Sequence, residues 1–301
     1  MLKNEKDIFN IMAGAAMIFT LMLVSGCAFA RTKHSHVDII DSHMHVYFDT
    51  DTAKGINQKR IATPDNFIIS LKNANISAAW ALVVAKKGNM LETEKLNDRL
   101  IEFAEKNRGV VIPAGSVHPD DKEGALKEME RISKLGVKVL KLHPNMQNFD
   151  VESPDVQKVA EKAGELKMVL LFDAYSPFDA NETGKFIKLC VSNPNTKFIL
   201  AHMGGLKFTD MLVFYALRQY PWYPNNVWFD TSFVATMFAG SPYQEQLVWV
   251  IRKIGVDRFL YGSDYPIFDT EDAIAGIEKL GFTCEEKRRI FYENAKALLT
   301  P

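Results

Sequence analysis

Two histidines, His43 and His45, are two positions apart directly after a short apolar run of the chain. Alternate side chains of an extended chain point to the same face, so both imidazoles can reach one divalent ion. Asp264 follows another apolar run, and a carboxylate at a buried strand end must be paired, protonated or bound to a metal. The residue types and their spacing predict a metal site that contains His43, His45 and Asp264.

Four further polar residues end other apolar runs: Lys141, His143, Asp173 and His202. Lys141 and His143 are two positions apart, so they share one face of their strand and point in the same direction. We expect this pair to bind an anionic or polar group of a substrate. The functional residues of a barrel lie where its strands end, which is where all of these side chains are predicted.

The elements that must position these residues alternate between short runs of Val, Ile, Leu and Phe and longer amphipathic stretches, a pattern typical of repeated βα units. The eight predicted strands are Val37–Ser42, Ala78–Ala85, Val110–Val117, Val137–His143, Met168–Asp173, Lys197–His202, Val227–Thr231 and Arg258–Ser263. Their even spacing, without a linker, predicts a single α/β domain over residues 37–301, a (β/α)8 TIM-type barrel. A doubly wound sheet is the alternative, but the first turn contains a metal motif instead of a glycine-rich phosphate turn.

In its motifs the chain resembles the amidohydrolase superfamily, in particular the amidohydrolase-related branch of hydrolases, lactonases and nonoxidative decarboxylases. The motifs that carry the resemblance are Asp41–His45, Lys141–Pro144, Leu200–Gly205, Tyr261–Pro266 and Asn294–Ala295. The resemblance implies that His43 and His45 bind a divalent metal, usually zinc, and that Asp264 contacts it and acts as the general base. It also implies that His202 is a second-site ligand or orients water and substrate. Bound zinc lowers the pKa of its water to about 7, which makes hydroxide available at neutral pH.

The chain departs from this branch at the end of the fifth strand, where Asp173 replaces the usual histidine. Aspartate can ligate zinc, and an oxygen-richer set of ligands also suits manganese. We therefore predict Asp173 as a metal ligand, with a helix-capping role as the alternative. Some members of the superfamily carboxylate a fourth-strand lysine to bridge two metals, and Lys141 is the residue of this chain that could do so.

Aromatic residues crowd the segments after the sixth and seventh predicted strands, and most have the helical spacing of core residues. Trp222 differs because it lies between Pro221 and Pro224, which keep it out of a helix. We predict that Trp222 contacts the substrate.

The first residues form a separate segment, in which Lys3 and Lys6 precede an apolar stretch that ends at Cys27. This layout predicts a lipoprotein-type signal peptide over residues 1–26, cleavage before Cys27, and an exposed tether over residues 27–36. An uncleaved anchor helix is the alternative, although the stretch is short for a membrane span. Both place the remaining chain outside the cytoplasm, and a lipid on Cys27 would hold it at a bacterial membrane.

The formal net charge of −1 and the absence of a basic stripe exclude a nucleic-acid partner. We therefore expect a small-molecule substrate; the sequence assigns no oligomeric state. The leading prediction is an exported metal-dependent hydrolase that acts on an amide, ester or lactone through a metal-activated water. The first alternative is a metal-dependent nonoxidative decarboxylase of a small carboxylic acid. The second is a surface lipoprotein that binds a ligand without catalysis.

Overall fold

A computed structural model describes residues 38–57 and 59–300 of the chain. The predicted signal peptide, the lipidation site at Cys27 and the tether lie outside these residues. Within the described part of the chain, no helix is both long and apolar enough to cross a membrane.

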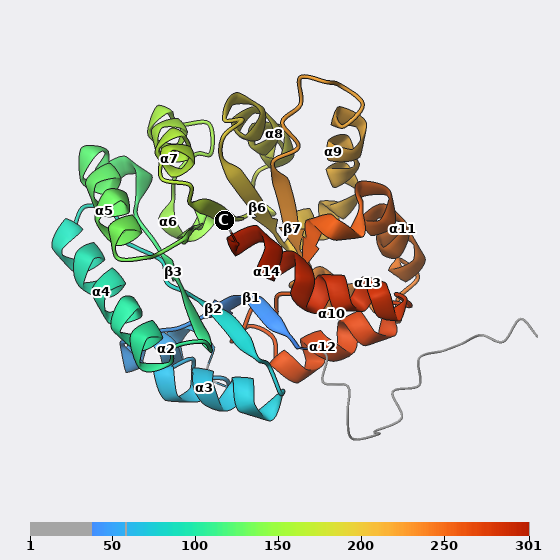
Figure 1. Ribbon diagram of the computed structural model, residues 1–301, viewed down its shortest axis with the longest axis horizontal. Helices are drawn as coiled ribbons and strands as arrows, with labels where there is room; N and C mark the ends of the chain where they lie inside the picture. Colours follow the sequence, from blue (N-terminus) through green and yellow to red (C-terminus); the bar gives the residue numbers. More distant parts are fainter. Residues whose placement is uncertain (1–37, 58, 301) are drawn as a thin grey trace, which may run out of the picture. The chain divides into compact units, whose positions relative to one another are not determined.

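Eight strands pair in their chain order and all pairings are parallel. The strands are β1 Ile40–His45, β2 Ala78–Leu82, β3 Val111–Gly115, β4 Val139–Leu142, β5 Val169–Asp173, β6 Lys197–Ala201, β7 Val227–Asp230 and β8 Phe259–Leu260. The circuit closes where β1 meets the segment after β8, because Ser42 N donates to Tyr261 O at 2.9 Å and His45 N donates to Tyr265 O at 2.8 Å. The predicted single-domain TIM-type barrel is therefore confirmed (Figure 1).

Helices connect the strands and cover the outside of the barrel (Figure 1). They are α2 Thr50–Ile56, α3 Pro64–Asn73, α4 Met90–Lys106, α5 Glu123–Lys134, α6 Pro144–Gln147, α7 Pro154–Glu165, α8 Glu182–Ser192, α9 Leu212–Leu217, α10 Val234–Phe238, α11 Gln244–Ile254, α12 Thr270–Lys279, α13 Cys284–Arg288 and α14 Asn294–Leu299, with a 3₁₀ segment η2 over His202–Met211. Helices α3, α4, α7 and α12 begin with side-chain caps: Asn89 Oδ1, for example, accepts from Glu92 N at the start of α4.

The barrel interior separates into an apolar layer and a polar layer. Val139 lies two residues before Lys141 and therefore faces the same side of β4, and Leu171 has the same relation to Asp173 on β5. Apolar residues of this layer pack together with Leu298 of α14, which covers the end of the barrel where the strands begin. Because that end is filled, the polar side chains gather where the strands finish.

The boundaries of β1 differ from the sequence prediction. The strand begins at Ile40, three residues later than predicted, and includes both histidines instead of ending before them. It extends this far because Met44 and His45 pair with Ala81 and Leu82 of β2, after a register shift between Asp41 and Met44. His43 and His45 are thus held by the sheet itself and not by a loop.

Candidate active site

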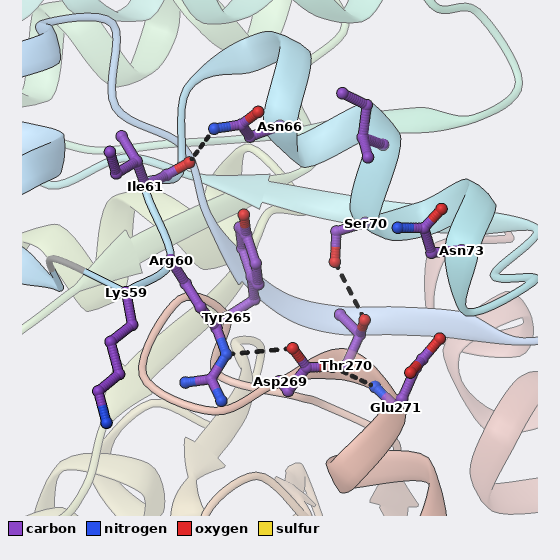
Figure 2. Close-up of a pocket in the computed structure, with 11 residues that line it drawn as sticks. Lys59, Arg60, Ile61, Asn66, Ser70, Asn73, Tyr265, Asp269, Thr270 and Glu271 are labelled. Carbon is purple, nitrogen blue, oxygen red and sulfur yellow. Dashed lines mark hydrogen bonds and ion pairs between the residues drawn. The ribbon is translucent and has the colours of Figure 1, made fainter.

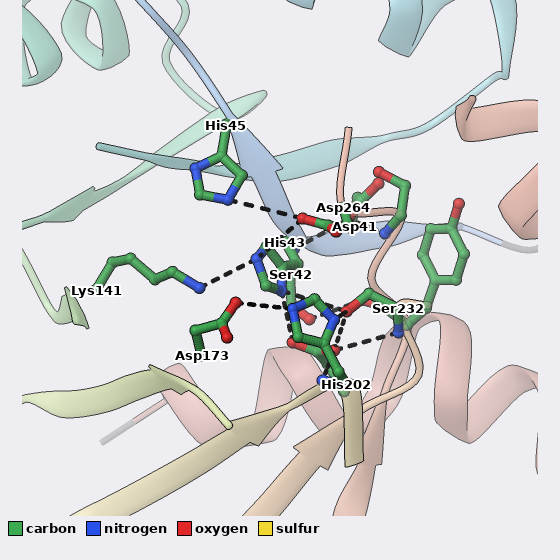
Figure 3. Close-up of polar contacts among 12 residues, drawn as sticks. Asp41, Ser42, His43, His45, Lys141, Asp173, His202, Ser232 and Asp264 are labelled. Atoms are coloured by element: carbon green, nitrogen blue, oxygen red, sulfur yellow. Dashed lines mark hydrogen bonds and ion pairs between the residues drawn. The ribbon is translucent and has the colours of Figure 1, made fainter. Parts of the chain in front are cut away.

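Three donor side chains meet where β1 and β8 finish. Asp264 Oδ1 lies 3.5 Å from His43 Nε2 and 3.7 Å from His45 Nε2 (Figure 3). These separations are too long for hydrogen bonds, but two ligands placed about 2.1 Å from one tetrahedral ion are about 3.4 Å apart. The set of two imidazoles and one carboxylate fits a divalent ion such as zinc or manganese.

The backbone holds Asp264 toward the histidines. The residue adopts a φ of 60°, which is rare for a residue with a side chain, and its N–H donates to His43 O at 2.8 Å. Behind it, the buried Asp41 carboxylate accepts from the N–H groups of both His43 and Ser263 at 3.0 Å. Burial raises the pKa of Asp41 to about 7. These contacts join the first and last strands at the site.

Asp230, at the end of β7, is a functional residue that the sequence analysis missed. Its Oδ2 lies 2.9 Å from His43 Nδ1, and both side chains are fully buried. A carboxylate on Nδ1 keeps the proton there and leaves Nε2 free as a ligand. Asp230 ends an apolar run in the same way as Asp173, so the strand-end rule could have identified it.

Ser232 was missed as well, and it links the two buried histidines of this region. Its hydroxyl contacts His202 Nδ1 at 2.9 Å and His43 Nδ1 at 3.3 Å, and it also donates to Asp230 Oδ1. No sequence pattern predicts this role, because a serine after a strand is common.

His202 and Asp173 form a second buried pair of this site, with Nε2 and Oδ2 2.9 Å apart. His143 Nε2 lies 3.4 Å from the same carboxylate oxygen. Burial disfavours an imidazolium, but the negative charges of Asp173, Asp264 and Asp230 together raise the pKa of His202 to about 9. For His143, burial dominates and lowers the pKa to about 4.

Lys141 reaches into the same site from β4. Its side chain is fully buried, and Nζ lies 3.1 Å from His43 Nε2. Burial lowers the pKa of Lys141 and also those of His43 and His45, whose imidazoles are further biased toward the neutral form by the lysine charge. Neutral imidazoles are the form that binds a metal.

The structure brings together seven of the eight residues predicted for the site, but they do not all lie where a metal ligand would. Among the described residues, His43, His202 and Asp264 form one group of donor atoms within 4.8 Å of one another. Asp173 faces His202 and His143 instead of the β1 histidines, and the nitrogens of both His43 and His202 contact neighbouring side chains. His43 and Asp264 are the donors common to this group and to the predicted set, and His45 also faces Asp264, with its Nε2 3.7 Å from Oδ1.

Trp222 is the predicted site residue that the structure does not bring to this group. It lies in the loop that leads from α9 into β7, at the end of the barrel where β7 begins. Its side chain is 58% exposed and stacks on Tyr220. The two flanking prolines do keep it out of a helix, but the loop they shape belongs to the wrong end of the barrel for substrate contact.

A surface cavity of about 280 Å³ lies between α3 and the start of α12 (Figure 2). Across it, Arg60 Nε donates to Asp269 Oδ2 at 3.1 Å and Ser70 contacts Thr270 at 3.0 Å. Tyr265 lines this cavity, whereas the preceding Asp264 faces the histidines. Because its polar groups pair with one another across the seam between the first and last units, we assign this cavity a packing role.

A model of the amidohydrolase family matches residues 40–300 of the chain. No curated protein matched in a separate search of characterised sequences. Solved structures with a similar fold include a dihydroxybenzoic acid decarboxylase from a Polaromonas species with bound manganese (17% identity, 87% of this chain and 96% of that chain, TM-score 0.67). They also include a 2,6-dihydroxybenzoate decarboxylase from Rhizobium (15%, 87% and 98%, 0.67) and a 5-carboxyvanillate decarboxylase from Sphingomonas paucimobilis (13%, 87% and 99%, 0.66). At these identities the likeness shows the fold.

Proposed function

Because this chain belongs to the amidohydrolase family, we propose that it is a metal-dependent enzyme, and that it removes the carboxyl group of a small carboxylic acid without an oxidant. This was the first alternative in the sequence analysis and now comes before hydrolysis. The similar solved structures that carry the names of decarboxylases support it. One of them contains manganese, which makes manganese as good a candidate as zinc.

The observation that carries the proposal is the environment of Lys141. Within the described part of the chain, the hydrogen-bond partner of its buried amine is an imidazole nitrogen, His43 Nε2, and no carboxylate lies within ion-pair distance. Asp173, Asp264 and Asp230 attract its charge from farther away, but a buried ammonium group without a direct ion-pair partner is costly. If His43 Nε2 held a metal, the Lys141 amine would need another acceptor. A substrate carboxylate supplies that acceptor, whereas a neutral ester or amide does not supply its charge.

His202 provides the proton that the reaction consumes. In decarboxylation the bond between the carboxyl carbon and its neighbour breaks, its electron pair stays on the neighbouring carbon, and carbon dioxide leaves. A proton then takes the place of the carboxyl group, so a carboxylate and a hydrogen ion give the shortened product and carbon dioxide. With a pKa of about 9, His202 is protonated at neutral pH, and Asp173 keeps it oriented.

His43, His45 and Asp264 would hold the metal. When bound, a divalent ion supplies a Lewis acid that orients the oxygen atoms of the substrate and withdraws electron density from them. The chain itself keeps both imidazoles neutral and fixes the ligating nitrogen of His43 through Asp230.

The test is release of carbon dioxide by protein loaded with manganese or zinc, from a panel of hydroxybenzoic and unsaturated acids, with esters, lactones and amides measured in parallel. We expect carbon dioxide from at least one acid, loss of activity and metal in His43→Ala, and a raised KM in Lys141→Met. Lys138→Met is the matched control, because Lys138 is exposed and directly precedes the first residue of the same strand. Ester, lactone or amide hydrolysis without carbon dioxide release would overturn the proposal.

Hydrolysis of an amide, ester or lactone is the second candidate, and the position of Asp264 favours it. Burial raises the pKa of this carboxyl group, and it faces both imidazoles of β1. A carboxylate of raised pKa beside a metal is suited to accept a proton from water. A non-catalytic binding protein agrees less well with the family and with the converging donors, so we do not propose it.

We further propose that the enzyme is exported and attached to a membrane through a lipid on Cys27, as the first residues of the sequence indicate. Mass spectrometry of the N-terminal peptide is expected to find diacylglycerol on Cys27 in material from membranes. Cys27→Ala is expected to release the protein from them. An unmodified and intact leader in the mature protein would contradict this proposal.

A further inference from the structure

Three aromatic rings from three different loops meet beside His202. Phe233, which follows β7, stacks on Tyr175 after β5 with ring centroids 5.5 Å apart, and contacts Phe268 after β8 edge-on at 6.1 Å. The ring of Phe233 also lies edge-on to that of His202 at 6.3 Å. All three aromatic side chains are half-buried, so each keeps part of its surface open at the end of the barrel where the donor groups lie.

The backbone of Phe233 adopts a conformation that a bulky residue rarely accepts. Its φ is 65° and its ψ is −62°, and Ser232 O accepts from Val234 N at 2.7 Å across it. This is a γ-turn with positive φ at its centre, a strained form that glycine tolerates far better. A phenylalanine in this strained conformation indicates a functional role, because backbone strain of this kind is concentrated at functional sites.

The turn has a direct geometric result. Ser232 directs its hydroxyl to His202 Nδ1, at 2.9 Å, and the reversal of the chain at the next residue brings the ring of Phe233 against His202 as well. One turn therefore positions both a polar contact and an aromatic face at the same imidazole.

The ring of Tyr175 also has a closely fitting position, which depends on Gly205. A side chain on Gly205 would place its Cβ 2.4 Å from two ring atoms of Tyr175, and Gly205 has a φ of 58°. The loop after β6 thus leaves space for the tyrosine ring, which in turn supports Phe233. The three rings form one packed unit, the aromatic cluster Tyr175–Phe233–Phe268.

We propose that Phe233, supported by Tyr175, determines substrate specificity by stacking on the planar ring of an unsaturated carboxylic acid. This inference rests on the proposed decarboxylation, since it assigns the ring a place beside His202, which donates the proton. Aromatic stacking adds to apolar burial, so a flat ring gains more from the cluster than a puckered ring of similar size.

Binding of two matched ligands tests the proposal without turnover. Benzoate is planar and cyclohexanecarboxylate is its saturated counterpart, and calorimetry on the metal-loaded full-length protein gives both affinities. We expect Phe233→Leu to weaken benzoate binding about 5-fold while cyclohexanecarboxylate changes less than about 2-fold. Phe233→Tyr, which keeps an aromatic ring, is expected to retain the preference for benzoate. Tyr220→Leu, at the opposite end of the barrel, is the control and should leave both affinities unchanged.

Phe233→Gly is a second variant for the case in which Phe233→Leu does not fold, because glycine adopts this turn without steric cost. It should lose the preference for benzoate to the same extent. Equal weakening of both ligands, or no change in either, would overturn the role of Phe233 even in an enzyme that releases carbon dioxide. A preference that depends on Phe233 in a protein without carbon dioxide release would instead support this inference and reject the proposed reaction.

Discussion

The active site contains two buried histidine–aspartate pairs of the same length that differ in charge. His43 lies 2.9 Å from Asp230, and His202 lies 2.9 Å from Asp173. Burial and the nearby Lys141 lower the pKa of His43, whereas burial of His202 is outweighed by Asp173, Asp264 and Asp230, which raise its pKa to about 9. The aspartate partner alone therefore does not decide the protonation state; the next charged neighbour does.

The difference in the protonation state of the two histidines suits the two pairs to different functions. The neutral imidazole of the His43–Asp230 pair is suited to present a ring nitrogen to a metal, and the protonated imidazole of the His202–Asp173 pair is suited to donate a proton. Four substitutions test this division, and their expected effects decrease from His202→Gln to Asp173→Asn.

His202→Gln removes the acid and leaves a polar side chain of similar length. We expect kcat to fall about 1,000-fold, which is within the range for loss of a general acid, while the metal content remains that of the parent protein. Steady-state kinetics and elemental mass spectrometry measure the two quantities. Loss of metal together with activity would instead make His202 a ligand and break the proposed division.

Asp230→Asn removes the negative charge behind His43 and permits an amide N–H to face Nδ1. The proton then moves to Nε2, and the metal affinity should fall about 10- to 100-fold, as for other groups that orient a ligand. Competition with a chelator measures the affinity. An unchanged affinity would show that the sheet alone fixes the imidazole of His43.

Gly262→Ala tests how closely the His43–Asp230 pair is packed. An added Cβ would lie 2.9 Å from His43 Cβ and 3.4 Å from Asp230 Cγ. We expect the free energy of unfolding to fall by about 1–3 kcal/mol, as for overpacking in a core. Gly184→Ala in α8 is the control because nothing lies within 4 Å of its added Cβ, and helix propensity predicts a gain of up to about 1 kcal/mol. Equal stability of the two variants would contradict close packing at Gly262.

Asp173→Asn changes the pH dependence of the His202–Asp173 pair. The pKa of His202 is about 9 in the folded protein, above the ordinary value of 6.5, so the pair stabilises the fold fully below about pH 6.5 and loses this contribution as the pH rises through 9. Activity that needs the imidazolium should fall over the same upper limb. Without the Asp173 charge the pKa of His202 is lower. The loss of activity and the loss of stability at high pH should therefore both begin at a lower pH, which pH–rate and pH–denaturation curves measure. If neither curve of the Asp173→Asn variant moved, groups other than Asp173 would be responsible for the raised pKa of His202.

Much of this architecture could be predicted from the sequence. The alternation of apolar runs and amphipathic stretches was enough to predict all eight strands, because a parallel strand is buried on both faces and therefore has a continuous apolar sequence. Polar residues that interrupt the pattern at strand ends identified His43, Lys141 and Asp264. Trp222 shows where the reasoning failed: a local pattern gives the shape of a loop, but not the end of the barrel to which it belongs.

What the sequence determined by itself was the kind of residue at each strand end and the periodicity that builds the barrel, since both depend on near neighbours along the chain. Only the tertiary structure decided which residues pair, and therefore which histidine is neutral and which is charged. Asp230 is 187 positions from His43, and Lys141 is 98 positions away. Electrostatic effects on a pKa depend on distances of a few ångströms in space, and closure of the barrel alone establishes those distances.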